Sequence, residues 1–320
     1  MFKNELPALP TPIFPDSNML TLDPSSISEL KTILVATDFS PASETALLYA
    51  LAIAKRNGSR VLITNVVTEN YQLISNDAQK RALDDAWREA QSLVTEQFIA
   101  GRLDGVNYEI RIERGDVWDR LSALIATEKV DLLVLGTRGH RSIGKLLLGS
   151  TAENIFRQAP CAVLSVGPRA RKEIPSTGPR RILFCTGFSH HSLNAGARAI
   201  WMAQRLHASL IMLNVCDECP PSPKQTKDLI DSNKRRLREL VPADAGLESE
   251  PEVLVEFGNF AERILETATH HKVDLIVLGI RQSAGFSRRL RGATAWNVVT
   301  AAACPVLTVR TPGSEEQDKF

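Results

Sequence analysis

The chain has 320 residues, of which 43% are hydrophobic and 23% charged, and its formal net charge is +1. This length favours two domains of ordinary size, and the near-neutral charge balance argues against nucleic-acid or membrane-surface binding. No apolar run approaches the ~20 residues that cross a bilayer, no secretory signal is visible, and five cysteines do not make a disulfide framework. We therefore expect a cytoplasmic protein.

Residues 1–30 carry five prolines without a sustained period, so we expect an extended or disordered leader that ends in a short helical turn at Ser25–Leu30. After the leader, short apolar runs alternate with longer amphipathic stretches, which predicts alternating strands and helices. The expected strands are 31–37, 60–67, 108–113, 132–135 and 162–166, and the expected helices are 42–57, 77–100, 117–128 and 152–158. Ser40 or Ser43 is expected to cap the first helix, which Gly58 ends. The side chains expected to face inward from the second helix are Leu83, Trp87, Leu93 and Phe98.

This order of elements occurs twice in the chain. Ile33–Ser40 aligns with Ile182–Ser189 at an offset of 149 residues, and Val130–Gly136 aligns with Val273–Gly279 at an offset of 143. Alternating strands and helices imply, in each copy, a parallel sheet with helices on both faces, which is an α/β fold. The expected domains are residues 31–167, called here the first repeat, and 180–310, called the second repeat, with a linker at 168–179 and a polar tail at 311–320.

A glycine-rich basic stretch follows the fourth expected strand. Gly136, Gly139 and Gly149 are spaced G-x2-G-x9-G, and Ser150 and Thr151 come next, just before an expected helix. Glycines permit close backbone approach, and the first N–H groups of a helix point unpaired at an anion, so this stretch suits a phosphate. The spacing is neither the Walker pattern nor G-x-G-x-x-G.

This spacing resembles the ATP-binding signature of the universal stress protein family, and the duplicated order resembles a tandem member of it. The resemblance implies an adenine-nucleotide alpha-hydrolase-like fold, with a five-stranded, mainly parallel sheet in each repeat. It also implies that Val163–Val166 and Val306–Val309 pair antiparallel, so that the chain is its own pseudo-dimer, and it leaves a further homodimer open. The cofactor implied is ATP, with or without Mg²⁺. The residues expected to hold the nucleotide are Asp38, Val66, Gly136, Arg138, Gly139, His140, Gly149, Ser150 and Thr151.

Each of these positions also has a structural interpretation. Asp38 can form an Asx turn or an N-cap before the first helix, and Val66 can be ordinary strand core. The glycines can belong to a turn without a ligand. The second repeat changes three of the positions, since Gly187, Gln282 and Ala293 replace Asp38, Gly139 and Ser150. We therefore expect the second repeat not to bind ATP.

The function that the resemblance implies is a stress-response or signalling protein that binds ATP in its first repeat and couples occupancy to an unknown protein partner. Two alternatives stay open. One is a slow ATPase or autokinase acting on Ser150 or Thr151, although we see no acidic pair for Mg²⁺ and no base beyond His140. The other is a scaffold without nucleotide. No catalytic residue and no metal site are predicted.

Two further motifs are interpreted as structural. Cys216-Asp-Glu-Cys219 is followed by prolines, so we expect no helix to start there and no redox or zinc site. The pairs His190-His191 and His270-His271 are expected at a helix start and a helix end.

Overall fold

A computed structural model describes residues 22, 27, 29–68, 76–137, 150–171, 178–281 and 294–311. The first repeat contains β1 (Thr32–Ala36), α1 (Pro41–Asn57), β2 (Arg60–Val67), α2 (Asn76–Ile99), β3 (Asn107–Arg114), α3 (Val117–Thr127), β4 (Leu132–Gly136), α4 (Ser150–Gln158) and β5 (Ala162–Val166). The second repeat contains β6 (Arg181–Cys185), α5 (His190–Leu206), β7 (Ser209–Cys216), α6 (Pro223–Glu239), β8 (Glu252–Phe257), α7 (Phe260–His270), β9 (Leu275–Arg281), α8 (Thr294–Ala301) and β10 (Val306–Thr311).

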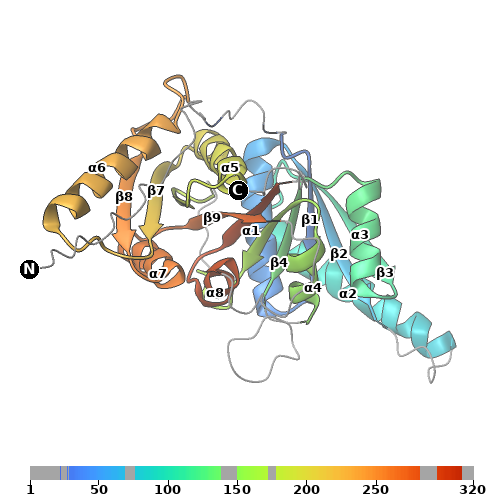
Figure 1. The fold of residues 1–320 in the computed structure, drawn as a ribbon. Coiled ribbons are helices and arrows are strands. Elements are labelled where there is room, and N and C mark those ends of the chain that lie inside the picture. Colours follow the sequence, from blue (N-terminus) through green and yellow to red (C-terminus); the bar gives the residue numbers. More distant parts are fainter. Residues whose placement is uncertain are drawn as a thin grey trace, which may run out of the picture.

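The described strands form one ten-stranded sheet in the order β3-β2-β1-β4-β5-β10-β9-β6-β7-β8. Strand pairs are parallel within each repeat, and the two repeats join through the antiparallel pair β5–β10, where Leu164 lies opposite Leu307. The two halves of the sheet therefore have the same strand order on either side of this junction (Figure 1). This arrangement confirms the α/β fold, the five parallel strands per repeat and the internal pseudo-dimer.

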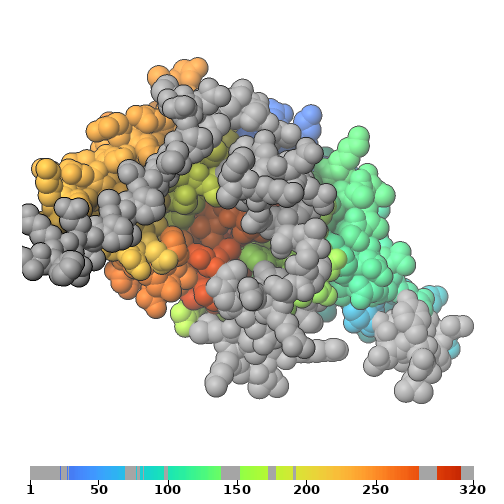
Figure 2. All heavy atoms as spheres, viewed as in Figure 1, coloured from blue at the N-terminus to red at the C-terminus, as the bar shows by residue number. Residues whose placement is uncertain are grey.

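Helices cover both faces of the sheet. Side chains alternate along each strand, so Ile33 and Val35 lie in one core and Leu34 lies in the other. Helices α1, α2, α5 and α6 contribute to the first core, and α3, α4, α7 and α8 contribute to the second. Both cores contain residues of both repeats, which consequently form one continuous body (Figure 2).

Side chains also join the repeats beside the β5–β10 pair. The rings of Phe156 in α4 and Trp296 in α8 meet edge to face, with their centroids 6.0 Å apart. The guanidinium of Arg310 in β10 donates a hydrogen bond to the backbone carbonyl of Phe156. Aromatic edge-to-face contacts add to the stability gained by burial, so this junction is packed like a core.

The first helix has the termini that its sequence predicts. Ser40 is the N-cap, and its side chain accepts a hydrogen bond from Ser43 N at 3.3 Å. Gly58 ends the helix in the left-handed conformation, with φ of 68°. The histidine pairs also lie as expected, since α5 begins at His190 and α7 ends at His270.

The expected inward positions of α2 are only partly right. Leu93 is buried and Leu83 is half-buried, but Trp87 is 42% exposed, so its prediction was wrong. Ala86 and Ala90 are buried on either side of this position, so α2 is covered there and Trp87 lies to the side of its buried face. The side chain of Phe98 lies outside the described part of the chain.

The expected helical turn at Ser25–Leu30 is wrong at Glu29 and Leu30, which are not helical; Ser25, Ser26 and Ser28 lie outside the described residues. Leu30 is instead buried, and its carbonyl accepts a hydrogen bond from Ser59 Oγ. The entry into β1 is therefore fixed by core packing.

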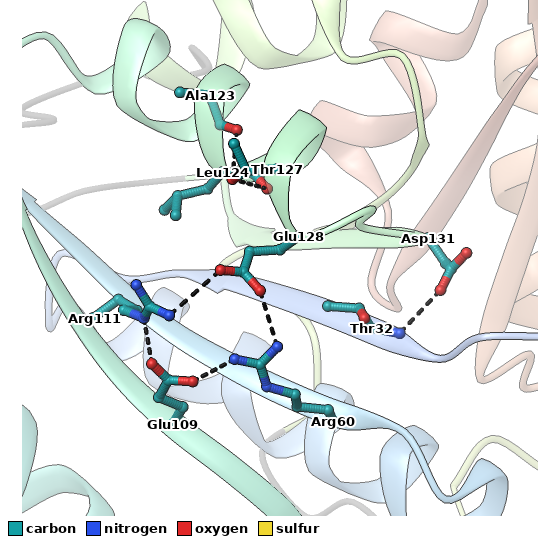
Figure 3. Close-up of polar contacts among 9 residues, drawn as sticks. All are labelled: Thr32, Arg60, Glu109, Arg111, Ala123, Leu124, Thr127, Glu128 and Asp131. Atoms are coloured by element: carbon teal, nitrogen blue, oxygen red, sulfur yellow. Dashed lines mark hydrogen bonds and ion pairs between the residues drawn. The ribbon is translucent and has the colours of Figure 1, made fainter.

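Four charged side chains form a closed network at the start of β2 (Figure 3). Arg60 Nη1 lies 2.9 Å from Glu128 Oε2, Arg111 Nη2 lies 3.4 Å from Glu128 Oε1, and both arginines also pair with Glu109. The hydrogen bond from Arg60 lowers the pKa of Glu109. Beside the network, Asp131 Oδ2 accepts from the N–H of Thr32 at 2.9 Å and so fixes the start of β1.

Candidate functional site

The turn after β1 is held by short polar side chains. Thr37 Oγ1 accepts a hydrogen bond from Phe39 N at 3.0 Å and lies 3.0 Å from Ser43 Oγ. Asn65 Nδ2 of β2 donates to the carbonyl of Thr37 at 2.8 Å. Phe39 takes a left-handed φ of 59°, which a non-glycine residue adopts at a cost, so these bonds fix a sharp change of direction between strand and helix.

Asp38 occupies the middle of this turn and its side chain is exposed. Its Oδ1 accepts a hydrogen bond from Ser40 N at 3.1 Å, which is the Asx turn of its structural interpretation. A carboxylate has about four lone-pair sites, so this one backbone bond leaves acceptor capacity for ligand hydroxyl or amino groups. The structural role and the predicted ligand role of Asp38 are therefore compatible.

Val66 lies near the end of β2, beyond the last residue of β1. The β1–β2 pairing ends where Ala36 meets Thr64, so β2 continues past its neighbour. The half-buried side chain of Val66 packs against the second core. The strand-core interpretation thus holds for its side chain, and its predicted contact with adenine involves only its backbone.

Gly136 is the last residue of β4 and approaches the start of α1 closely. A Cβ built at this position would lie 2.7 Å from the backbone of both Ala42 and Ser43. Real Cβ atoms essentially never come so near, so α1 can cross over β4 only if this residue is glycine. Packing is therefore a sufficient reason for Gly136, and its nucleotide role stays a prediction.

The remaining predicted site residues are described in part or not at all. Helix α4 begins at Ser150, with Thr151 next, which is two residues before its expected start at Ala152. Both residues therefore stand at a helix N-terminus, where backbone N–H groups can bind an anion. The predicted site residues Arg138, Gly139, His140 and Gly149 lie outside the described residues.

The second repeat builds the same turn without the carboxylate. Thr186 Oγ1 accepts from Phe188 N at 2.9 Å, Asn214 Nδ2 donates to the carbonyl of Thr186 at 2.9 Å, and Phe188 has φ of 61°. Gly187 takes the place of Asp38, and a Cβ added there would meet no atom within 4 Å. The two repeats therefore share the hydrogen bonds of this turn but not the carboxylate that it exposes.

A cavity of about 140 Å³ lies beside this second turn. The described residues that line it are uncharged and come from the ends of β6, β7 and β9 and the starts of α5, α7 and α8. Ligand pockets usually measure ~300–1,000 Å³, so a nucleotide would not fit within this volume. A larger cavity of about 530 Å³ lies along the connection between α6 and β8, at the opposite end of the strands from the predicted site.

One detail of the prediction for the Cys216–Cys219 motif was wrong. Helix α6 does begin just after it, at Pro223, with Ser222 as the N-cap. Proline is tolerated at the first helical position because the N–H that it lacks would be unpaired there. Burial raises the pKa of Cys216, which disfavours its thiolate, and both thiols are free. Among the described residues, no His, Cys, Asp and Glu cluster could hold a metal ion.

The helices of the described residues include none that is both long and apolar enough to cross a bilayer.

Comparisons with known proteins agree with this fold. A protein of Staphylococcus haemolyticus named as a universal stress protein is 34% identical over 150 residues, covering 45% of this chain and 87% of that protein. The crystal structure of a universal stress protein from Archaeoglobus fulgidus has a TM-score of 0.67 at 20% identity, covering 88% of this chain and 99% of that chain, and this likeness shows the fold alone.

A universal stress protein solved in complex with cAMP also matches, at 24% identity over 41% of this chain and 96% of that chain; its TM-score of 0.31 supports no comparison of sites. The sequence profile of the universal stress protein family matches residues 29–167 and again residues 178–310. The chain therefore belongs to the universal stress protein family and carries two copies of its fold in tandem.

Proposed function

We propose that the first repeat binds ATP in the crevice at the carboxyl ends of β1 and β4. The observation that carries this proposal is the exposed carboxylate of Asp38, held in a hydrogen-bonded turn. Strand β1 lies between β2 and β4, so the chain leaves the sheet in opposite directions from β1 and β4. Ligands of open α/β sheets bind at such a switch point, outside the carboxyl ends of the strands.

The proposed contacts combine the positions of the described residues with the residues that the sequence predicts for the site. Asp38 accepts hydrogen bonds from the ribose hydroxyls, and the backbone of Val66, beyond the end of β1, contacts adenine. The start of α4 at Ser150 supplies N–H groups for the phosphates, with the hydroxyl of Thr151 as a further donor. The basic glycine loop of the sequence, with Arg138, Gly139, His140 and Gly149, completes the phosphate site of the proposal.

The second repeat is proposed to be silent toward ATP. Gly187 offers no carboxylate where Asp38 stands in the first repeat, and the cavity beside it is small, with uncharged side chains among the described residues that line it. In sequence, Gln282 and Ala293 replace Gly139 and Ser150. Micromolar affinity corresponds to only ~8 kcal/mol, so several lost contacts remove useful binding.

Occupancy would then act as a signal in the cytoplasm. If bound ATP changes the affinity for a protein partner, the partner must change the affinity for ATP by the same factor. We propose that the loop between Gly136 and Ser150 transmits nucleotide binding to the protein partner, because it joins the strand and the helix that are proposed to contact the nucleotide.

Titration calorimetry with ATP tests the site through two matched variants. Asp38→Ala removes the acceptor and is expected to weaken binding by ~10–100-fold, because a hydrogen bond to a charged group contributes ~1.5–3 kcal/mol. Asp38→Asn keeps an oxygen that can accept from Ser40 N, so the turn persists while the charge is lost. Its affinity is expected between those of the wild type and the alanine variant, with one nucleotide bound per chain.

Gly187→Ala, the counterpart in the second repeat, is expected to leave ATP affinity unchanged because a Cβ fits there freely. Wild-type affinity in Asp38→Ala, or two nucleotides per chain, would contradict the assignment. Arg138→Ala is expected to weaken ATP more than AMP, and equal losses would remove this arginine from the phosphate site.

A further inference from the structure

Leu22, in the leader, is buried in the second repeat although it precedes the first strand of the first repeat. Its side chain is 3% exposed and belongs to the first core. Its backbone N–H donates to the carbonyl of Leu240, directly after α6, at 2.8 Å. Leu22 lies outside both segments that match the family profile, so it is an addition to the duplicated fold.

The site that receives Leu22 is a gap in helix α5. A Cβ built at Gly196 would lie 2.5 Å from Leu22 Cδ1 and 2.8 Å from the ring of Phe184. Leu22 therefore packs against the bare backbone of α5, beside a phenylalanine of β6 that is itself fully buried. We call the site formed by Phe184, Gly196 and the Leu240 carbonyl the socket.

The first repeat fills the same place with its own side chains. At the repeat offset of 149 residues, Gly196 corresponds to Leu47 and Phe184 corresponds to Val35. Leu47 is 1% exposed and Val35 is fully buried, so α1 carries the leucine that α5 lacks. In the second repeat the strand carries the larger side chain of Phe184, and the helix has no side chain at Gly196. Leu22 supplies a leucine side chain at this place.

Further contacts hold the leader between the two repeats. Glu29 Oε1 lies 3.2 Å from Arg205 Nη2 in α5, and the carbonyl of Leu30 accepts from Ser59 Oγ in the first repeat. The linker in turn contacts the first repeat, because the carbonyl of Arg171 accepts a hydrogen bond from the hydroxyl of Tyr49 in α1 at 3.3 Å. Each segment that leads into a first strand thus contacts the first helix of the other repeat.

We propose that Leu22 is the missing core side chain of the second repeat and that, with Glu29 and Leu30, it forms a strap joining the repeats. The occupant is the chain's own leader, since the backbone bond, the side-chain contact and the flanking ion pair all come from one segment that continues into β1. Removing a buried leucine leaves a cavity that the surrounding backbone refills only in part, so the second repeat depends on this strap.

Leu22→Ala in the full chain is expected to lower Tm by about 5 °C or more. Hydrogen exchange should rise in α5 and at the end of α6, and stay unchanged in α1, where Leu47 fills the equivalent place. Unchanged exchange in α5, or an equal rise in α1, would overturn the proposal.

A rebuilt socket provides the matched control. Phe184→Val with Gly196→Leu restores the pair found in the first repeat, so adding Leu22→Ala to this background should change Tm by less than about 1 °C. The same drop in both backgrounds would mean that Leu22 acts elsewhere. If the double variant fails to fold, the exchange pattern of Leu22→Ala in the wild-type background decides alone.

Light scattering identifies the source of the strap. Wild type and Leu22→Asp should have the same mass over a range of concentrations, because the strap belongs to the same chain. A wild-type dimer that dissociates in Leu22→Asp would show that the leader docks on a second copy, and this would overturn the assignment of the occupant.

Discussion

The two repeats share the turn after their first strand and differ in the one residue that the turn presents. Thr37 and Thr186 make the same bonds to the following phenylalanine N–H, and an asparagine of the second strand donates to each of their carbonyls. Only the position of Asp38 changes, to Gly187. The residues that hold the turn are thus the same in both repeats, whereas the exposed residue at its centre differs.

A second difference between the repeats lies at the opposite end of the strands, where β2 begins. The first repeat joins Arg60, Glu109, Arg111 and Glu128 in a closed network. At the corresponding positions the second repeat keeps a single pair, in which Nδ1 of a histidine, His271, lies 3.4 Å from Glu252 Oε2. The position of Arg111 is taken in the second repeat by Leu254, which packs against the second core, so apolar contact replaces part of the network there.

The largest effect on stability is expected from a substitution at Gly136, with Gly187 of the second repeat as its comparison. Gly136→Ala places a Cβ against the backbone of α1, where no side chain can yield, so we expect a loss of ~3 kcal/mol or more in the free energy of unfolding. Gly187→Ala meets no atom and should change it by less than ~0.5 kcal/mol. Urea unfolding of both variants measures the difference. Similar values would mean that strand β4 and helix α1 are not so closely packed.

A smaller contrast is expected between the two turn asparagines. Asn214 is 4% exposed, donates to the carbonyl of Thr186, and accepts from Asn233 Nδ2 at 3.0 Å, whereas Asn65 is only half-buried. Asn214→Ala removes the side-chain donor to the Thr186 carbonyl and the oxygen that accepts from Asn233, and should cost ~2–3 kcal/mol, against ~1 kcal/mol for Asn65→Ala. Thermal unfolding of the two variants checks the order. A greater loss of stability in Asn65→Ala than in Asn214→Ala would contradict the larger structural contribution assigned to Asn214.

The sequence predicts the sheet well because its signals are local and repeated. The apolar runs at 132–135 and 275–278 predict a buried strand in each copy, and the family resemblance implies that β5 and β10 pair. Turn residues such as Ser40 and Gly58 also carry their own signal. The packing reason for Gly136 was not predictable, because it depends on how near α1 passes to β4.

Long-range packing accounts for what the sequence did not show. Leu22 lies in a proline-rich stretch without periodicity, and its partner Gly196 is more than 170 residues away. The only sequence signal was the mismatch of Leu47 with Gly196 in the repeat alignment, which marks a gap but not what fills it. The prediction for Trp87 was wrong for a different reason, since amphipathic spacing does not fix how wide the buried face of a helix is.

The smallest effect is expected from the charged network of the first repeat. Because the folded-state pKa of Glu109 is lowered by Arg60, its contribution is present above the unfolded pKa of ~4.3 and is lost as pH falls through the folded value. Its side chain is 38% exposed, so solvent screening limits the contribution to less than ~1 kcal/mol. Glu109→Gln should therefore be slightly less stable than wild type at pH 7, and the difference should vanish below about pH 4.

Urea unfolding of Glu109→Gln at pH 7, 5 and 3 measures this dependence, with Glu252→Gln in the second repeat as the counterpart. The partner of Glu252 is a histidine, which is charged only when protonated, so its loss at pH 7 should be smaller than that of Glu109, which pairs with two arginines. A difference for Glu109→Gln that grows toward acid would contradict the lowered pKa. Equal losses for both variants at pH 7 would mean that the arginine network adds nothing to the first repeat beyond what one weaker pair gives the second.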